Sequence, residues 1–189
     1  MPTERLLITG EDMRRVISRI AHEIVERNRG ADGLVLVGLQ RRGVPLAHWL
    51  AGAIQSFEDV AVPVGALDTN LYRDDLTSRP QPTVRPTALP VDVDDKVVVL
   101  VDDVLYTGRT ARAALNALMD FGRPTQVQLA VMVDRGHREL PIRADYVGKN
   151  VPTAANEQVR VRVDDFDSVD EVVLVVDADL VPGEREVPA

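Results

Sequence analysis

Val97-Val98-Val99-Leu100-Val101-Asp102-Asp103-Val104-Leu105-Tyr106-Thr107-Gly108-Arg109-Thr110 is the stretch that decides the fold. Its first five residues are aliphatic and four of them are β-branched, which predicts a strand over 96–101 that is buried on both faces. The turn-forming residues at 104–108 follow, and 110–121 then shows helical spacing of its apolar residues, with Gly122 as a helix stop. A buried strand that leads through a short loop into a helix predicts an α/β fold with a mostly parallel sheet covered by helices.

The segments on either side repeat this pattern. A helix is predicted over 11–28, because its apolar residues recur every three or four positions and Thr9 can cap its first turn. Further strands are predicted over 33–38, 61–67 and 127–133, a further helix over 44–54, and a closing pair of strands over 159–163 and 172–176. Four prolines between residues 73 and 90 exclude a regular helix there, so residues 70–90 are interpreted as a lid or hood loop.

Composition limits the classes of protein that the chain can belong to. Its 189 residues are predicted to form one domain, 1–189. It has no cysteine, which excludes disulfides, thiolate catalysis and iron–sulfur clusters. It also has no apolar run of the roughly 20 residues that cross a bilayer and no signal-peptide pattern, so we expect a cytoplasmic protein without membrane association. The net charge is −8, but the acidic segment 157–189 holds ten acidic and three basic residues, which leaves room for a basic face elsewhere.

The deciding stretch also carries chemistry. Asp102 and Asp103 stand at the carboxyl end of a strand, where open α/β sheets bind ligands, and ribose hydroxyls with Mg²⁺ nearby would satisfy two adjacent carboxylates. The turn 107–110 precedes a helix whose first amides suit a phosphate group. An ordinary solvated strand end is the alternative. A Walker A loop is excluded because Gly43 is followed by Val-Pro, and a receiver domain is disfavoured because only 86 residues follow Asp103.

Residues 97–110 resemble the phosphoribosyl pyrophosphate (PRPP) signature of type I phosphoribosyltransferases. Other segments narrow this resemblance to the PyrR family of bifunctional pyrimidine operon attenuators and uracil phosphoribosyltransferases. The segments are SRIAHEI at 18–24, LYRDDL at 71–76, GRP at 122–124, VDRGHRELPIRAD at 133–145 and VGKNVPT at 147–153. The resemblance covers residues from about 11 to 153 and implies the type I phosphoribosyltransferase fold, with a twisted, mostly parallel sheet flanked by helices and a hood.

The resemblance implies conversion of uracil and PRPP into UMP and diphosphate, with Mg²⁺ as cofactor. Asp102 and Asp103 would bind the ribose, and Arg135 and His137 would lie near the base, where His137 assists proton removal from uracil. The residues expected to bind PRPP or UMP are Arg41, Arg42, Gly43, Tyr72, Arg73, Asp102, Asp103, Val104, Leu105, Tyr106, Thr107, Gly108, Arg109 and Thr110. A structural or RNA-facing role for His137 stays open, as does a purine as the base.

The same resemblance implies a UMP-dependent, RNA-binding attenuator of pyrimidine operon transcription that acts on the messenger RNA leader. The residues expected to contact RNA are Arg19, His22, Arg27, Arg138, Arg143 and Lys149. Ala154-Ala155-Asn156 replaces the Ser-Arg-Ser expected from the family pattern, which removes one cation. A homo-oligomer, a dimer or larger, would enlarge the RNA-binding surface. The alternative is an RNA-binding nucleotide sensor with little catalytic turnover.

Overall fold

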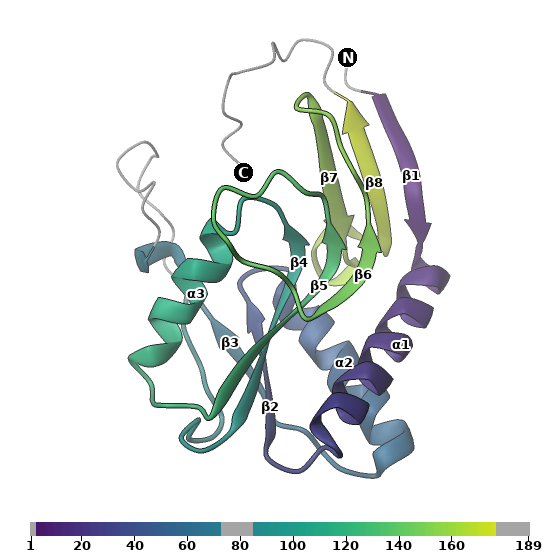
Figure 1. Ribbon diagram of the computed structural model, residues 1–189. Helices are drawn as coiled ribbons and strands as arrows, with labels where there is room; N and C mark the ends of the chain where they lie inside the picture. The colour runs from purple at the N-terminus through teal and green to yellow at the C-terminus, as the bar shows by residue number, and fades with distance from the viewer. Residues whose placement is uncertain (1–2, 73–84, 177–189) are drawn as a thin grey trace.

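Two sheets organise the molecule. The computed structural model describes residues 3–72 and 85–176 (Figure 1). A five-stranded parallel sheet has the strand order β3-β2-β4-β5-β6, and a three-stranded antiparallel sheet has the order β1-β8-β7. The strands are β1 (Thr3–Thr9), β2 (Leu34–Leu39), β3 (Val64–Leu67), β4 (Val97–Leu105), β5 (Gln126–Asp134), β6 (Tyr146–Asn150), β7 (Glu157–Arg162) and β8 (Glu171–Val176).

Helices cover both faces of the parallel sheet, as predicted. The helices α1 (Gly10–Asn28) and α2 (Gly43–Glu58) pack on one face, and α3 (Arg109–Met119) packs on the other (Figure 1). Thr9 caps α1 by accepting a hydrogen bond from the Asp12 amide. The predicted apolar stripe of α1 is buried at Met13, Ile17, Ile20 and Ile24, and Val16 is half-buried. The two resulting cores fix β4 in the middle of the molecule.

The antiparallel sheet confirms the predicted closing pair, because β7 and β8 form a hairpin. Two strands were not predicted. Strand β1 pairs with β8, although its exposed charges give it no continuous apolar run. Strand β6 has only one fully buried residue, Tyr146, so the sequence shows no strand pattern there. Both strands depend on partners distant in sequence, which local periodicity cannot reveal.

Several boundaries differ from the prediction, and the difference at β4 affects the site. Strand β4 continues to Leu105, so Asp102 and Asp103 lie within it rather than after it. The reason is its partner β5, which pairs with β4 as far as Asp134, whereas the pairing of β2 with β4 ends at Val101. The two carboxylates therefore stand on the part of β4 that extends beyond β2. Helix α3 also ends two residues earlier than predicted.

Only the ends of the predicted lid can be described. It begins with a 3₁₀ turn, Asn70–Tyr72, and returns through a bridge between Ala66 and Ala88. Buried Asp68 joins the two ends, because its carboxylate accepts hydrogen bonds from the backbone amides of Asn70 and Arg85. Arg73, predicted to bind PRPP, lies outside the described residues. None of the helices in the described ranges is long and apolar enough to cross a membrane.

Candidate active site

Asp102 and Asp103 form the centre of the candidate site, on the extension of β4 beyond β2. Each carboxylate accepts a hydrogen bond from the next backbone amide, Asp103 N–H to Asp102 at 2.9 Å and Val104 N–H to Asp103 at 2.8 Å. Burial raises the pKa of the Asp103 carboxyl, and the hydrogen bond with Asp102, the Val104 amide and the Arg42 guanidinium oppose that rise. Asp103 is therefore a carboxylate held in an environment that disfavours its charge, which is common at functional sites.

The loop 40–43 lies directly beside these carboxylates. It leads from β2 into α2, and Gly43 at the start of α2 lies against the backbone of β4. A Cβ atom at Gly43 would stand 2.2 Å from the Val101 carbonyl oxygen, so only glycine permits this close approach. The contact brings the side chain of Arg42 close enough to Asp103 for the two charges to attract each other.

Both arginines of this loop contact a short helix, α4 (Asp164–Asp167), which connects β7 to β8. Arg42 donates two hydrogen bonds to the Asp167 carboxylate, from Nε at 3.1 Å and from Nη2 at 2.8 Å. This pairing raises the pKa of Arg42 and lowers the pKa of Asp167. The Arg41 guanidinium stacks over the ring of Phe166, 4.1 Å from its centroid. Neither α4 nor its contacts to the loop were predicted.

The turn 106–108 and the start of α3 form the third part of the site. Gly108 adopts a left-handed conformation with φ of 90° and caps α3 without a side-chain hydrogen bond. A Cβ atom at Gly108 would stand 3.3 Å from the Ile142 Cβ, so its lack of a side chain lets the loop after β5 pack against the first turn of α3. The amides and dipole of that turn attract an anion. The Arg109 side chain is paired with Glu139 at 2.7 Å. The turn and the helix start therefore lie beside the paired carboxylates, and phosphate binding by their backbone amides stays a prediction.

The loop after β5 wraps over this turn. The backbone amides of Glu139 and Leu140 both donate to the Thr107 carbonyl, at 3.0 and 3.1 Å. Arg138 donates to the Tyr106 carbonyl at 2.6 Å and pairs with Asp134 at 2.6 Å. Arg138, which was predicted to contact RNA, thus lies in the wall of the candidate active site.

Arg135 and His137 meet Tyr106 at one side of the site. The Arg135 side chain is buried, donates to Thr153 Oγ1 at 3.1 Å and stacks 4.1 Å from the centroid of the Tyr106 ring. His137 is exposed, and its Nε2 lies 2.6 Å from the Thr153 carbonyl oxygen. A carbonyl oxygen only accepts hydrogen bonds, so Nε2 carries the proton and Nδ1 is the basic nitrogen of the neutral ring.

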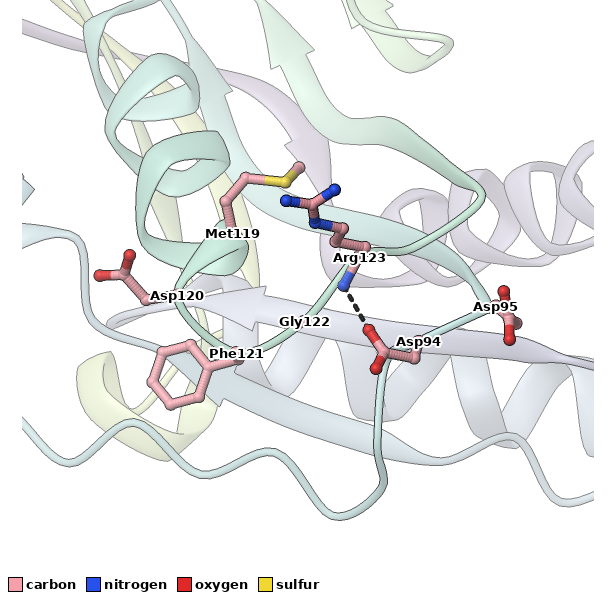
Figure 2. A pocket seen from close by; sticks show the side chains of 7 residues that line it. All are labelled: Asp94, Asp95, Met119, Asp120, Phe121, Gly122 and Arg123. Atoms are coloured by element: carbon pink, nitrogen blue, oxygen red, sulfur yellow. Dashed lines mark hydrogen bonds between the residues drawn. The ribbon is translucent and has the colours of Figure 1, made fainter.

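Tyr72 contacts a different part of the molecule. Its hydroxyl donates to Asp120 just after α3, and this hydrogen bond raises the pKa of Tyr72. Asp120 also lines a surface hollow near the start of β4, at the opposite end of that strand from Asp102. Figure 2 shows this hollow with Asp94, Asp95, Met119, Asp120, Phe121, Gly122 and Arg123 around it. It lies away from the carboxyl ends of the strands, where ligands bind in open α/β sheets.

Three of the residues predicted to contact RNA lie along the edge strand β6. Arg19 on α1 donates to the carbonyls of Val147 and Gly148, at 3.1 and 2.7 Å, and Lys149 donates to the Leu7 carbonyl at 3.1 Å. Arg27 pairs with Asp145, just before β6, at 2.9 Å. His22 lies on the same helix and stacks on Phe57, and Arg143 is exposed in the segment before β6. We call Arg19, Arg27 and Lys149 the β6 stripe.

The donor set of the site fits a magnesium ion that arrives with its ligand. Among residues 3–72 and 85–176, no group of three or more His, Asp or Glu side chains could enclose a metal. Two adjacent carboxylates are present, and Mg²⁺ commonly binds through one or two carboxylates together with substrate phosphates and water. The residues therefore fit a metal held jointly by Asp102, Asp103 and a phosphorylated substrate.

Comparison with known proteins agrees with this geometry. The family model described as the phosphoribosyl transferase domain matches residues 7–165. Among solved structures, the hypoxanthine phosphoribosyltransferase of Trypanosoma cruzi is similar with a TM-score of 0.69 at 22% identity, over 91% of this chain and 95% of that one. A hypoxanthine phosphoribosyltransferase of Staphylococcus aureus has a TM-score of 0.68 at 19% identity, over 93% of both chains. At these identities the likeness shows the fold, which is the predicted type I phosphoribosyltransferase fold.

Curated relatives are much closer in sequence. A protein named bifunctional protein PyrR from Pelotomaculum thermopropionicum is 60% identical over 95% of this chain and 100% of its own length. A protein of the same name from Thermus aquaticus is 62% identical over 89% of this chain and 93% of its own length. Identity this high across nearly the whole length, together with the match of residues 7–165 to the phosphoribosyl transferase domain, places the chain in the phosphoribosyltransferase superfamily as a member of the PyrR family.

Proposed function

We propose that this protein transfers the phosphoribosyl group of PRPP to uracil, forming UMP and diphosphate. The observation that carries the proposal is the convergence of three parts at one end of β4: the pair Asp102 and Asp103, the start of α3 and the arginine loop 40–43. These three parts match the three polar groups of PRPP, in which a ribose diol lies between a 5′-phosphate and a pyrophosphate.

The chemistry follows from the roles of these groups. Asp102 and Asp103 accept hydrogen bonds from the ribose hydroxyls and stabilise the positive charge that develops on the sugar as the bond from C1′ to pyrophosphate breaks. The first-turn amides of α3 hold the 5′-phosphate, and Arg41 and Arg42 attract the departing pyrophosphate. Bound Mg²⁺ would neutralise part of the pyrophosphate charge.

Uracil approaches C1′ of the ribose from the side where Tyr106, Arg135 and His137 meet. Uracil N1 forms the bond to C1′ and gives up its proton, which Nδ1 of His137 accepts. Arg135 supports this wall by fixing the Tyr106 ring, because its guanidinium is buried between that ring and Thr153. This arrangement favours a planar base, and a pyrimidine is proposed on the strength of the family rather than of the wall alone.

An assay of UMP formation, with purine bases as competitors, distinguishes a uracil phosphoribosyltransferase from a purine phosphoribosyltransferase. Purified protein with PRPP and Mg²⁺ should form UMP from uracil, and hypoxanthine or guanine in excess should not compete. Absence of UMP would remove the uracil transferase function, and competition by a purine base would indicate a purine phosphoribosyltransferase instead.

We also propose that the β6 stripe binds RNA, with UMP in the active site as the signal. The supporting observation is that Arg19 and Arg27 on α1 and Lys149 on β6 lie along one sheet edge, in a chain whose net charge is negative. Cations that contact phosphates give binding that weakens with salt. A second copy of the chain would extend this surface, which is why we expect a homo-oligomer.

The variant Lys149→Ala tests the RNA site. Its affinity for the pyrimidine operon leader RNA should fall, and the slope of log affinity against log salt should decrease by about 1, because one phosphate contact is lost. UMP formation should stay at the wild-type rate. Arg123→Ala is the matched control, since Arg123 is an exposed cation in the hollow at the other end of the molecule.

Filter binding across a salt series, with and without UMP, measures both quantities. Equal loss in the two variants would contradict the β6 stripe as the RNA site. RNA affinity that UMP does not change, and that equals the affinity for an unrelated RNA, would contradict the regulatory function. RNA binding that responds to UMP in a protein without turnover would support a nucleotide sensor.

A further inference from the structure

The short helix α4 makes specific contacts with the arginine loop, although more than a hundred residues separate them in sequence. Phe166 and Asp167 on α4 contact Arg41 and Arg42, respectively. Among the residues that the structure describes, α4 supplies both the ion pair of Arg42 and the ring contact of Arg41. The hairpin β7–β8 thus holds α4 against the loop that approaches Asp103.

Arg42 and Asp167 are each held by more than one hydrogen bond. The carboxylate accepts from Nε at 3.1 Å and from Nη2 at 2.8 Å, so the guanidinium is held along one edge. Asp167 is itself fixed, because its carboxylate accepts from the Val163 amide at 3.0 Å and its own amide donates to the Val163 carbonyl at 2.8 Å. A guanidinium has five N–H donors, so the edge with Nη1 keeps donors for a second anion.

Phe166 holds the other arginine in a different way. Its ring is 40% exposed, and the guanidinium of exposed Arg41 lies over it at 4.1 Å. Stacking keeps the guanidinium oriented and leaves its charge in place. Arg41 therefore stays available to an anion in a restricted set of positions.

The Arg42 side chain, which Asp167 holds, has a second carboxylate nearby. The Asp103 carboxylate also attracts the Arg42 guanidinium, and Asp103 is one of the two proposed ribose-binding groups. A long arginine side chain without an anchor has many rotamers, and immobilising it when a ligand binds lowers the affinity. An arginine that is already ordered avoids most of this loss.

We propose that α4 is a positioning element for pyrophosphate, in which Asp167 orients Arg42 and Phe166 orients Arg41 before PRPP binds. Asp167 and Phe166 touch no substrate atom in this arrangement and act only through the two arginines. The proposal rests on the proposed function, since it takes the loop 40–43 as the pyrophosphate site. It adds two residues that the sequence motifs did not indicate.

A double-mutant cycle between Arg42 and Asp167 tests this role. Asp167→Asn should raise KM for PRPP by about tenfold and leave kcat and the KM for uracil within about twofold, which is the pattern of a lost binding interaction. The dissociation constant of inorganic pyrophosphate should rise in parallel, whereas that of UMP, which has no pyrophosphate, should not change. In an Arg42→Ala background, Asp167→Asn should add less than about twofold, because residues that act through each other are not additive.

Three further variants sharpen the result. Asp167→Glu retains a carboxylate and should recover part of the loss, and Phe166→Leu should give a smaller rise in KM for PRPP, about threefold, within the range of a cation–π contact. Asp164→Asn is the control, because it removes an exposed carboxylate from the same helix. It should leave the KM for PRPP unchanged.

The outcomes separate this proposal from the proposed function. If the wild-type protein forms no UMP, the function fails, and the pyrophosphate titrations still test the positioning role. An equal effect of Asp167→Asn with and without Arg42, an equal weakening of UMP and pyrophosphate binding, or no change in pyrophosphate binding would overturn the positioning role. Wild-type protein that does not bind pyrophosphate would overturn it as well.

Discussion

Replacing Asp103 by asparagine should make the protein more stable and nearly inactive at the same time. The carboxylate stabilises charge on the ribose in the proposed reaction, and loss of one such group lowers turnover by about 100-fold or more. In the absence of substrate, the same charge is unfavourable, because burial raises the pKa of Asp103. Functional sites often lower the stability of the fold in this way.

The pH dependence of the melting temperature shows whether the charge of Asp103 stabilises or destabilises the fold. A raised pKa means that the folded protein binds the Asp103 proton more strongly than the unfolded chain does. Below the ordinary aspartate pKa of about 3.9 both states are protonated, and the variant and the wild type should melt at similar temperatures. As the pH rises from there through the higher pKa of the folded state, the wild type loses stability that the variant keeps. At neutral pH the variant should melt a few degrees higher.

Thermal melts from acid to neutral pH, together with kcat and KM for PRPP, measure both effects. Asp164→Asn is again a suitable control, because that carboxylate is exposed on α4. Turnover at the wild-type rate would show that Asp103 does not bind the ribose. A lower melting temperature at neutral pH would show that the charge of Asp103 stabilises the folded protein through Arg42 instead.

Gly43→Ala should have the second large effect, on both stability and PRPP binding. The added Cβ would stand 2.2 Å from the Val101 carbonyl oxygen, and both groups belong to backbone that cannot rotate away. Overpacking of this kind costs about 1–3 kcal/mol. The start of α2 must move away from β4, and Arg42 moves with it. A displacement of about 1 Å in a binding group can cost about 100-fold in rate.

Gly52→Ala in the same helix is the matched control. Nothing lies within 4 Å of a Cβ at Gly52, so this change should stabilise α2 by about 0.5–1 kcal/mol through its helix propensity. Urea unfolding and the KM for PRPP compare the two variants. If Gly43→Ala keeps both the stability and the PRPP affinity of the wild type, close packing of α2 on β4 is not required for the site.

The sequence predicted the parts of the molecule that local pattern can encode. The aliphatic run 97–101 and the helical spacing in 11–28 each reflect burial in a single element, and both elements form as predicted. The paired carboxylates and the turn at Gly108 were found for the same reason, because one continuous segment contains them. The parallel direction of the strands in the larger sheet followed from the alternation of strands and helices in the sequence.

The features that were missed depend on contacts between distant segments. Strand β1 is polar on its exposed face and is a strand because β8 pairs with it. Asp167 looks like one of many acidic residues near the C-terminus, and no spacing rule connects it to Arg42. Arg138 was predicted to contact RNA because it is a cation in a family motif, and the structure adds hydrogen bonds to Tyr106 and Asp134 that the sequence did not indicate. The sequence alone could not have distinguished these environments.

The pairing of β1 with β8 has a consequence for synthesis of the protein on the ribosome. Strand β1 is made before its partner β8, which is the last described strand to be made, and Arg162 on β7 also binds Glu4 on β1. The small sheet that holds α4 therefore cannot assemble until translation has passed β8, whereas the larger sheet can begin to form sooner. A nascent chain stalled before β8 would contain Asp102 and Asp103 but would lack an oriented Arg42. Competence to use PRPP should thus appear abruptly, once β8 has been translated.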